Sequence, residues 1–183
     1  LRAIAIIAQV LRQQLAQRGS HLDVLAQGEW PKLRLMERFR AGAGPQGGCI
    51  LVASASFWEG FDVPGDALQL VVIDKLPFPP PGDPLVEART LQIEQSGGSA
   101  FKEYALAEAA VALKQGAGRL IRHESDRGVL VVCDSRLVRM GYGKRLIAAL
   151  PPMRRLSGTE DFQVALEDLA SITRTSTTDQ TFL

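Results

Sequence analysis

The sequence predicts an α/β domain in which helices cover both faces of a parallel sheet. Residues 49–55, 68–74 and 129–133 are apolar throughout, as strands buried on both faces are. Stretches with helical spacing of apolar residues separate them, and such alternation is typical of a parallel sheet. Functional groups of these sheets lie at the carboxyl ends of the strands. The residues that follow each strand are therefore the first candidates for a site.

The first part of the chain predicts two helices and a further short strand. Residues 1–18 repeat apolar side chains at helical spacing, and a glycine ends the run. Residues 21–26 are a short apolar stretch that predicts a strand. Residues 31–40 predict a helix, opened by a proline of the kind favoured in a first helical turn. The glycine-rich residues 42–48 predict a loop before the next strand.

The middle of the chain predicts an irregular segment, a strand, a stiff loop and two helices. Residues 57–67 contain two glycines and a proline and predict irregular structure before the strand at 68–74. Residues 77–84 are rich in proline and predict a stiff loop. Residues 85–95 predict one helix, and the alanine-rich stretch from 101 to 113 or beyond predicts another.

After the strand at 129–133, the sequence predicts two helices of opposite charge. Residues 137–150 predict a helix with basic side chains, which two prolines end, and residues 160–172 predict an acidic amphipathic helix. We expect the polar last ten residues to fray. The predicted domains are residues 1–156 and a C-terminal helix and tail at 157–183.

Composition excludes several classes of protein. The chain has 183 residues, of which 46% are hydrophobic and 22% charged, so it is too apolar to be disordered along its length. Its longest apolar run, Ala3 to Ala8, is far shorter than the ~20 residues of a membrane span. Both cysteines, Cys49 and Cys133, fall in predicted strands, as inert core thiols of a reducing compartment do. We therefore expect a cytoplasmic location.

Positive charge is concentrated late in the chain. The formal net charge is only +1, so any surface for nucleic acid must be local. Residues 136–155 contain no acidic residue and six basic ones: Arg136, Arg139, Lys144, Arg145, Arg154 and Arg155. A solvated helix face is the alternative interpretation of this run.

Several catalytic patterns are missing from the sequence. Gly143-Lys144 is followed by Arg145 instead of Ser or Thr, so no phosphate-binding P-loop is present. The two histidines, His21 and His123, have neither metal-ligand nor triad spacing. Two cysteines cannot hold an iron–sulfur cluster, which usually needs four thiolates. We predict no metal site in this chain and no self-sufficient hydrolase.

The first candidate site is the run from Gln115 to Arg122, QGAGRLIR. On a helix, Arg119 and Arg122 would share one face, with Gln115 one turn earlier. Gly116 and Gly118 each cost about 1 kcal/mol in a helix, which indicates close approach of a backbone or ligand. Two guanidinium groups on one face suit a polyphosphate. Two surface arginines at a frayed helix end are the alternative.

The second candidate follows a predicted strand, at residues 54–65. Serine hydroxyl groups and backbone N–H groups at a strand end can hold phosphate oxygens, and Asp62 can accept from a ribose hydroxyl. Phe57 and Trp58 can stack on bases or pack in the core. A turn with a structural tryptophan is the alternative interpretation.

Together these segments resemble the DinG/XPD-like family of superfamily-two DNA helicases, of the bacterial DinG/YoaA type. Residues 115–122 match the family's motif VI pattern, Gln-x-x-Gly-Arg-x-x-Arg, at every defined position. Residues 56–66, SFWEGFDVPGD, are similar to its motif V region. The runs at 73–78 and 128–136 are similar to the family as well. The order and spacing agree over residues 1–153.

The resemblance implies the C-terminal RecA-like half of a 5′-to-3′ helicase that couples ATP hydrolysis to movement along single-stranded DNA in repair or replication. The N-terminal RecA-like half would be its partner and would bind most of the ATP and Mg²⁺ through the P-loop. That half also holds an iron–sulfur cluster in many members, and none is expected here. We expect a fragment that lacks the first strand of its sheet, is inactive alone and contacts no membrane.

The resemblance also implies roles for individual residues. Arg119 and Arg122 would reach the γ-phosphate as arginine fingers, and Gln115 would position that phosphate or the attacking water. The implied nucleotide-binding residues are Gly60, Asp62 and Gly118, and the implied DNA-binding residues are Ser54, Ser56, Gln27 and Lys75.

Two other functions stay open. The chain can be a non-catalytic module that binds single-stranded nucleic acid, because it has no P-loop of its own. It can also belong to a helicase-like nuclease of the same family, with an exonuclease domain ahead of the helicase core.

Overall fold

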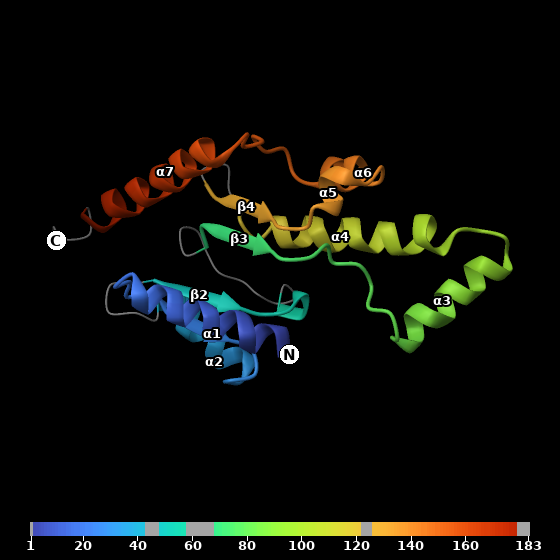
Figure 1. The fold of residues 1–183 in the computed structure, drawn as a ribbon, viewed down its shortest axis with the longest axis horizontal. Coiled ribbons are helices and arrows are strands. Elements are labelled where there is room, and N and C mark those ends of the chain that lie inside the picture. Colours follow the sequence, from blue (N-terminus) through green and yellow to red (C-terminus); the bar gives the residue numbers. More distant parts are fainter. Residues whose placement is uncertain (1, 43–47, 58–67, 122–125, 179–183) are drawn as a thin grey trace. The chain divides into compact units, whose positions relative to one another are not determined.

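The chain folds into two compact units, residues Leu1–Ala67 and Leu68–Leu183. The structure is a computed structural model that describes residues 2–42, 48–57, 68–121 and 126–178, with side chains up to residue 171. Figure 1 shows its helices and strands. Each unit is described by itself.

The first unit is a pair of parallel strands between two helices. Strands β1 and β2 pair in parallel, with Asp23 opposite Cys49. Helix α1 packs on one face, where Ile4 and Ala8 contact Val24 and Ala26. The elements are α1 (Arg2–Gln17), β1 (Asp23–Ala26), α2 (Lys32–Arg40), β2 (Cys49–Val52) and the 3₁₀ helix η1 (Ala55–Phe57).

Helix α2 covers the other face of these strands. Successive side chains of a strand point to opposite faces, so Cys49 points away from the face that Ile50 and α1 share. The Cys49 Sγ atom donates to the backbone carbonyl of Phe39, near the end of α2. Helices on both faces of parallel strands, as the sequence predicts, are therefore confirmed for this unit.

The second unit contains another pair of parallel strands and most of the helices. Strands β3 and β4 pair in register from Leu70 with Val129 to Ile73 with Val132. Helix α4 is its central helix, with Leu106, Ala109, Leu113 and Ala117 all buried. The elements are β3 (Leu70–Ile73), α3 (Pro84–Gln95), the π-helix η3 (Phe101–Ala105), α4 (Leu106–Ala117), β4 (Val129–Val132), α5 (Arg136–Arg139), α6 (Gly143–Ala149) and α7 (Thr159–Thr178).

Two predicted helices differ from the structure. The helix expected over 137–150 is divided into α5 and α6, because the chain turns between Met140 and Tyr142. The alanine-rich helix begins with the wider π turn η3 before the α-helical part. Helix α7 continues to Thr178, so part of the tail predicted to fray is helical.

The predicted α/β class is confirmed as short parallel strands with helices. Within the described residues, β1 pairs with β2 and β3 pairs with β4, each as a separate two-stranded sheet. One continuous RecA-like sheet, the missing first strand and the domain boundary at residue 156 stay predictions. Among the residues that the structure describes, no helix is both long and apolar enough to cross a membrane.

Candidate nucleotide and nucleic-acid sites

Three predicted DNA-binding residues meet at the carboxyl edge of β1 and β2. Gln27 follows β1, and Ser54 and Ser56 follow β2, so parallel pairing places them at the same edge. The Gln27 Oε1 atom accepts from the backbone N–H of Ser54 at 2.8 Å and from its hydroxyl at 2.9 Å. The Ser54 and Ser56 hydroxyl oxygens lie 2.8 Å apart. The Gln27 amide NH₂ is therefore directed away from the serines.

The sequence does not single out the basic side chains of α2, and one of them, Lys32, contacts this polar cluster. The Lys32 Nζ atom donates to the carbonyl oxygen of Ser56 at 3.0 Å and lies 5.1 Å from the centre of the Phe57 ring. The Arg34 and Arg38 guanidinium groups each lie 5.5 Å from the Trp30 ring. The spacing of Trp30, Arg34 and Arg38 at intervals of four residues is the pattern that predicts this stacking.

An ion pair fixes the turn that follows β1. Arg12 of α1 donates to both carboxylate oxygens of Glu29, at 2.8 and 2.7 Å, and to the carbonyl oxygen of Val24 at 2.6 Å. The hydrogen bonds from Arg12 lower the pKa of Glu29. Gly28 supplies the positive φ of 101° that the turn requires. These contacts hold Gln27 at the edge of the strands.

Asp134 joins the carboxyl ends of the strands in the second unit. Its side chain is only 8% exposed and accepts from the backbone N–H groups of Leu76, after β3, and of Arg136, after β4, each at 3.0 Å. The Arg136 guanidinium group donates to the same carboxylate at 2.6 Å. These hydrogen bonds, from the Arg136 side chain first, hold the pKa of Asp134 well below its usual range. Lys75, a predicted DNA-binding residue, lies exposed beside Leu76.

Three aromatic rings meet at this same edge. Phe78 follows β3, Phe101 begins η3, and Tyr142 lies between α5 and α6. Their ring centres lie 5.2 to 5.9 Å apart in all three pairs. The Arg136 guanidinium group lies 5.5 Å from the Phe78 ring. We call Phe78, Phe101 and Tyr142 the aromatic cluster.

The predicted arginine finger Arg119 lies in a turn. Helix α4 ends at Ala117, and the Arg119 backbone N–H donates to the Gly116 carbonyl oxygen at 3.3 Å. Arg119 therefore lies beyond the helix on which the sequence places it, because α4 ends before Arg119. Arg122 lies outside the described residues. Arg119 is half-buried with its Nε atom buried, whereas Gln115 is exposed on the last turn of α4.

This turn lies at the amino ends of β3 and β4. The Gly128 residue directly before β4 is so close to Leu120 that a Cβ atom would lie 2.8 Å from the Leu120 side chain. The same Cβ atom would lie 3.2 Å from the carbonyl oxygen of Gln69, directly before β3. Arg119 is therefore next to the edge opposite Asp134. Arg119 thus lies away from the carboxyl ends of β3 and β4, the edge at which the sequence analysis expects functional groups.

Of the three predicted nucleotide-binding residues, the structure describes only Gly118. Gly118 follows α4 with φ of −65°, and its backbone N–H donates to the Lys114 carbonyl oxygen at 2.8 Å. A Cβ atom there would lie 3.2 Å from that oxygen, a close but not prohibitive contact. Gly60 and Asp62 lie outside the described residues. Within the described ranges, no three His, Cys, Asp or Glu side chains gather as metal ligands would.

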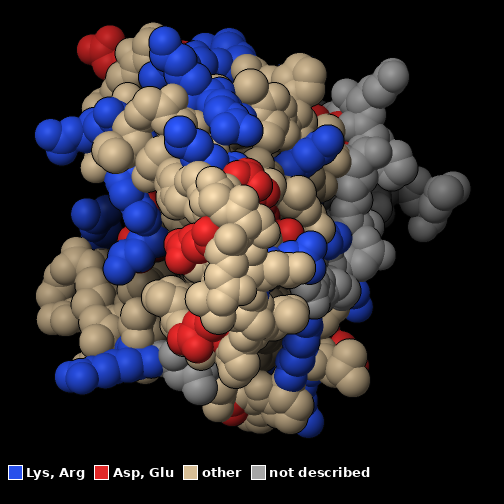
Figure 2. All heavy atoms as spheres, turned by 90° about the vertical axis from the view of Figure 1, so that its right-hand side faces the viewer, with Lys and Arg blue, Asp and Glu red and all other residues tan. Residues whose placement is uncertain are grey.

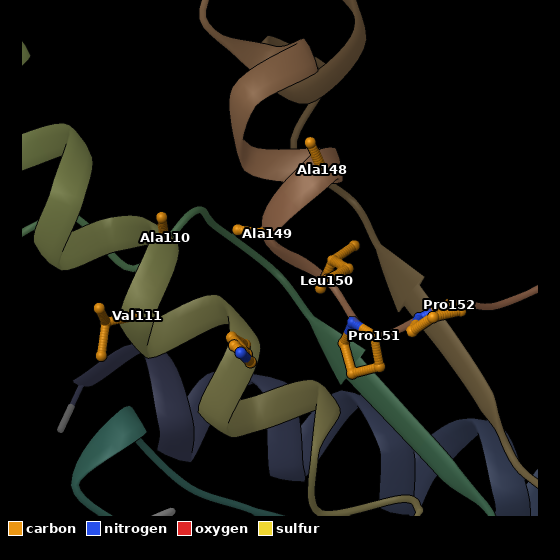
Figure 3. A pocket seen from close by; sticks show the side chains of 8 residues that line it. Ala110, Val111, Ala148, Ala149, Leu150, Pro151 and Pro152 are labelled. Atoms are coloured by element: carbon orange, nitrogen blue, oxygen red, sulfur yellow. The ribbon is translucent and has the colours of Figure 1, made fainter.

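A hollow on the second unit contains none of the predicted site residues. Ala110 and Val111 of α4, Lys114 and the segment 148–152 line a space of about 460 Å³ (Figure 3). Its walls are mostly aliphatic, and Lys114 supplies the positive charge. The candidate sites are therefore the edges of the two strand pairs, and this hollow is separate from them.

Comparison with known proteins relates the chain to helicases. The family described as "Helicase C-terminal domain" matches residues 2–153. The chain is 50% identical over 149 residues to the ATP-dependent DNA helicase YoaA of Escherichia coli, covering 81% of this chain and 22% of the relative. It is 39% identical over 170 residues to the ATP-dependent helicase DinG of Mycobacterium tuberculosis, covering 93% and 24%.

A third relative carries a different activity in its name. The chain is 35% identical over 147 residues to the 3′-5′ exonuclease DinG of Bacillus subtilis, covering 79% of this chain and 15% of the relative. The chain thus spans less than a quarter of the length of each of these three relatives.

Proposed function

Because this chain belongs to the helicase C-terminal domain family, we propose that it is the C-terminal, RecA-like half of an ATP-dependent DNA helicase. The whole protein would couple ATP hydrolysis to 5′-to-3′ movement on single-stranded DNA in repair or replication. The observation that carries this proposal is the turn at the end of α4, where Gln115, Gly118 and Arg119 gather at one edge of β3 and β4.

The turn after α4 fits a nucleotide by the chemistry of its donors. A guanidinium group and an amide offer N–H donors to phosphate oxygens, and the Arg119 charge offsets the negative end of the α4 dipole. Arg119 and Arg122 would stabilise the charge on the γ-phosphate, with Gln115 beside them. Gly60, Asp62 and Gly118 would bind the nucleotide. ATP and Mg²⁺ supply the phosphoryl chemistry, and we assign most of their binding to the N-terminal RecA-like half.

The DNA-binding side of the proposal rests on the carboxyl edges of both units. The Gln27 amide NH₂, the Ser54 and Ser56 hydroxyl groups and the Lys75 ammonium group are donors that phosphate oxygens accept from. Lys32 adds positive charge next to Ser56. Single-stranded DNA and the N-terminal half would thus be the partners, in the cytoplasm. Any iron–sulfur cluster would belong to the N-terminal half.

The test is DNA-stimulated ATP hydrolysis by the full-length protein that carries this chain, with Arg119→Ala and Arg122→Ala variants. We expect hydrolysis to fall about 10³-fold or more, because an arginine finger contributes about 10³ to 10⁵ in rate. ATP affinity should change little, since the finger acts mainly on the charge of the transition state. The exposed Arg18→Ala on the first unit is the matched control and should hydrolyse ATP normally.

Unchanged hydrolysis in both arginine variants would overturn this proposal in favour of a non-catalytic module for single-stranded nucleic acid. The exonuclease name of the Bacillus subtilis relative supports a second candidate, a helicase-like nuclease. Digestion of 3′-labelled single-stranded DNA by the full-length protein, in the presence of Mg²⁺ and without ATP, tests that candidate.

A further inference from the structure

We propose that the aromatic cluster is a stacking platform for a base of single-stranded DNA, with Phe101 as the ring that the base contacts. This inference rests on the proposed function. It adds where the DNA would contact the second unit and that the contact would be base stacking. It assigns base stacking to Phe78, Phe101 and Tyr142, whereas the predicted DNA contacts of Gln27, Ser54, Ser56 and Lys75 are polar.

The geometry of the cluster leaves one ring, that of Phe101, exposed to a base. Phe101 is 44% exposed, whereas Phe78 and Tyr142 are half-buried. Phe101 lies 5.7 Å from Phe78 at an angle of 31° and 5.2 Å from Tyr142 at 64°. Two supporting rings limit the movement of Phe101 and hence the entropy lost when a base stacks on it.

The backbone around the cluster is held in place from both strands. The Asp134 carboxylate accepts from the backbone N–H of Leu76, two residues before Phe78, and pairs with the Arg136 guanidinium group. That guanidinium group lies over the Phe78 ring. Phe101 begins a π turn, a wider turn that occurs frequently at functional sites. A cluster that served only to pack loops together would gain most by burying all three rings, and Phe101 is instead left open to solvent.

Exposed basic side chains adjoin the cluster in sequence. Lys75 precedes Phe78, Lys102 follows Phe101, and Lys144 and Arg145 follow Tyr142. Figure 2 shows Lys and Arg side chains gathered toward the top of the view, the height at which Figure 1 draws α5, α6 and α7. Asp134 is paired with Arg136, and the exposed acids Asp74 and Glu103 also adjoin the cluster in sequence.

This combination fits a flexible, negatively charged strand with unpaired bases. Single-strand sites combine cations along the backbone with aromatic rings under successive bases. Paired bases of a duplex do not present their faces, so an exposed ring favours single strands. The cluster also lies at the carboxyl edge of β3 and β4, the edge at which parallel α/β sheets bind ligands.

The test compares two oligonucleotides of equal length and charge, oligothymidylate and a strand of abasic sugars, by fluorescence anisotropy with the full-length protein. We expect Phe101→Leu to weaken binding of oligothymidylate about five-fold or more and to leave binding of the abasic strand unchanged. Phe101→Tyr should retain wild-type binding, because it keeps a ring. Leu91→Ala, which removes a 57% exposed apolar side chain from α3, is the matched control.

If Phe101→Leu loses the same affinity for both strands, or loses affinity for neither, the stacking proposal is overturned. Circular dichroism of Phe101→Leu establishes that the variant folds, and 2-aminopurine in the strand reports stacking directly through its quenched fluorescence. If the wild-type protein binds neither strand, the proposed DNA function itself fails. If it binds both and Phe101→Leu does not distinguish them, only the platform fails.

Discussion

At the scale of single residues, Asp134 has the most hydrogen-bonded side chain at the carboxyl edge of the second unit. It accepts from two backbone N–H groups and from the Arg136 side chain. The bond to Leu76 is the one that matters for the fold, because it connects the segment after β3 with the segment after β4. Asp134 is therefore a positioning residue for the loop that carries Phe78.

We expect Asp134→Asn to lower the free energy of unfolding by about 1.5 kcal/mol, because hydrogen bonds to a charged group are lost and Arg136 is half-exposed. The pKa of Asp134 is depressed in the folded chain, so its carboxylate stabilises the fold above the ordinary pKa of 3.8. That stabilisation is lost as the pH falls below this value. Urea unfolding of both proteins should show a difference at neutral pH that shrinks below about pH 4. A difference that is constant with pH would contradict this assignment.

The sequence predicts the positions of some candidate residues better than those of others, for a physical reason. Gln27, Ser54 and Ser56 follow predicted strands, and strand ends define an edge, so their meeting in the structure is what the pattern implies. The alanine-rich stretch predicts a helix from 101 to 113 or beyond, and Arg119 falls on it only if that helix continues. Helical spacing does not show where a helix ends, and α4 ends at the glycine before Arg119.

At the scale of elements, the break between α5 and α6 depends on Gly143. Its Cβ atom would collide with the carbonyl group of Leu137, coming within 2.7 Å of the carbonyl carbon. The predicted single helix over 137–150 ignores this contact, because basic and apolar side chains keep helical spacing across the break. The two glycines at 141 and 143, weak helix formers, were the available signal.

We expect Gly143→Ala to destabilise the chain by about 2 to 3 kcal/mol, because the backbone must move to accept the methyl group. Gly141→Ala is the matched control: no atom lies within 4 Å of its Cβ position, and its φ is not positive. Denaturant unfolding of the two variants makes the comparison. If both substitutions lower the free energy of unfolding by the same amount, close packing of α5 on α6 is not the reason for a glycine at position 143.

At the scale of the whole molecule, the net charge limits how the proposed binding of DNA could arise. A formal net charge of +1 gives little attraction at a distance, so affinity must come from local positive surfaces. Helices α5 and α6 carry Arg136, Arg139, Lys144 and Arg145 without an acidic residue. The pairing of β1 with β2 and of β3 with β4 was not predictable from composition, since apolar strands indicate a parallel sheet but not its strand order.

We expect the double variant Lys144→Gln, Arg145→Gln to bind single-stranded DNA more weakly and with a smaller salt dependence. Each lost phosphate contact reduces the slope of log K against log salt by about 0.7 for a single strand. Titrations of the full-length protein at several salt concentrations measure this slope. Phe101→Leu should leave the slope unchanged, since it removes no charge, and Arg18→Gln is the control for charge alone.

The course of α4 through the second unit has a mechanical consequence. One end of this helix follows Phe101 at the carboxyl edge of the strands, and the other precedes Arg119 at the amino edge. Its 12 residues make a rod about 18 Å long, and Leu106, Ala109, Leu113 and Ala117 are buried along it. Because α4 is one continuous helix, a displacement of the end next to Arg119 would also shift the end next to the aromatic cluster.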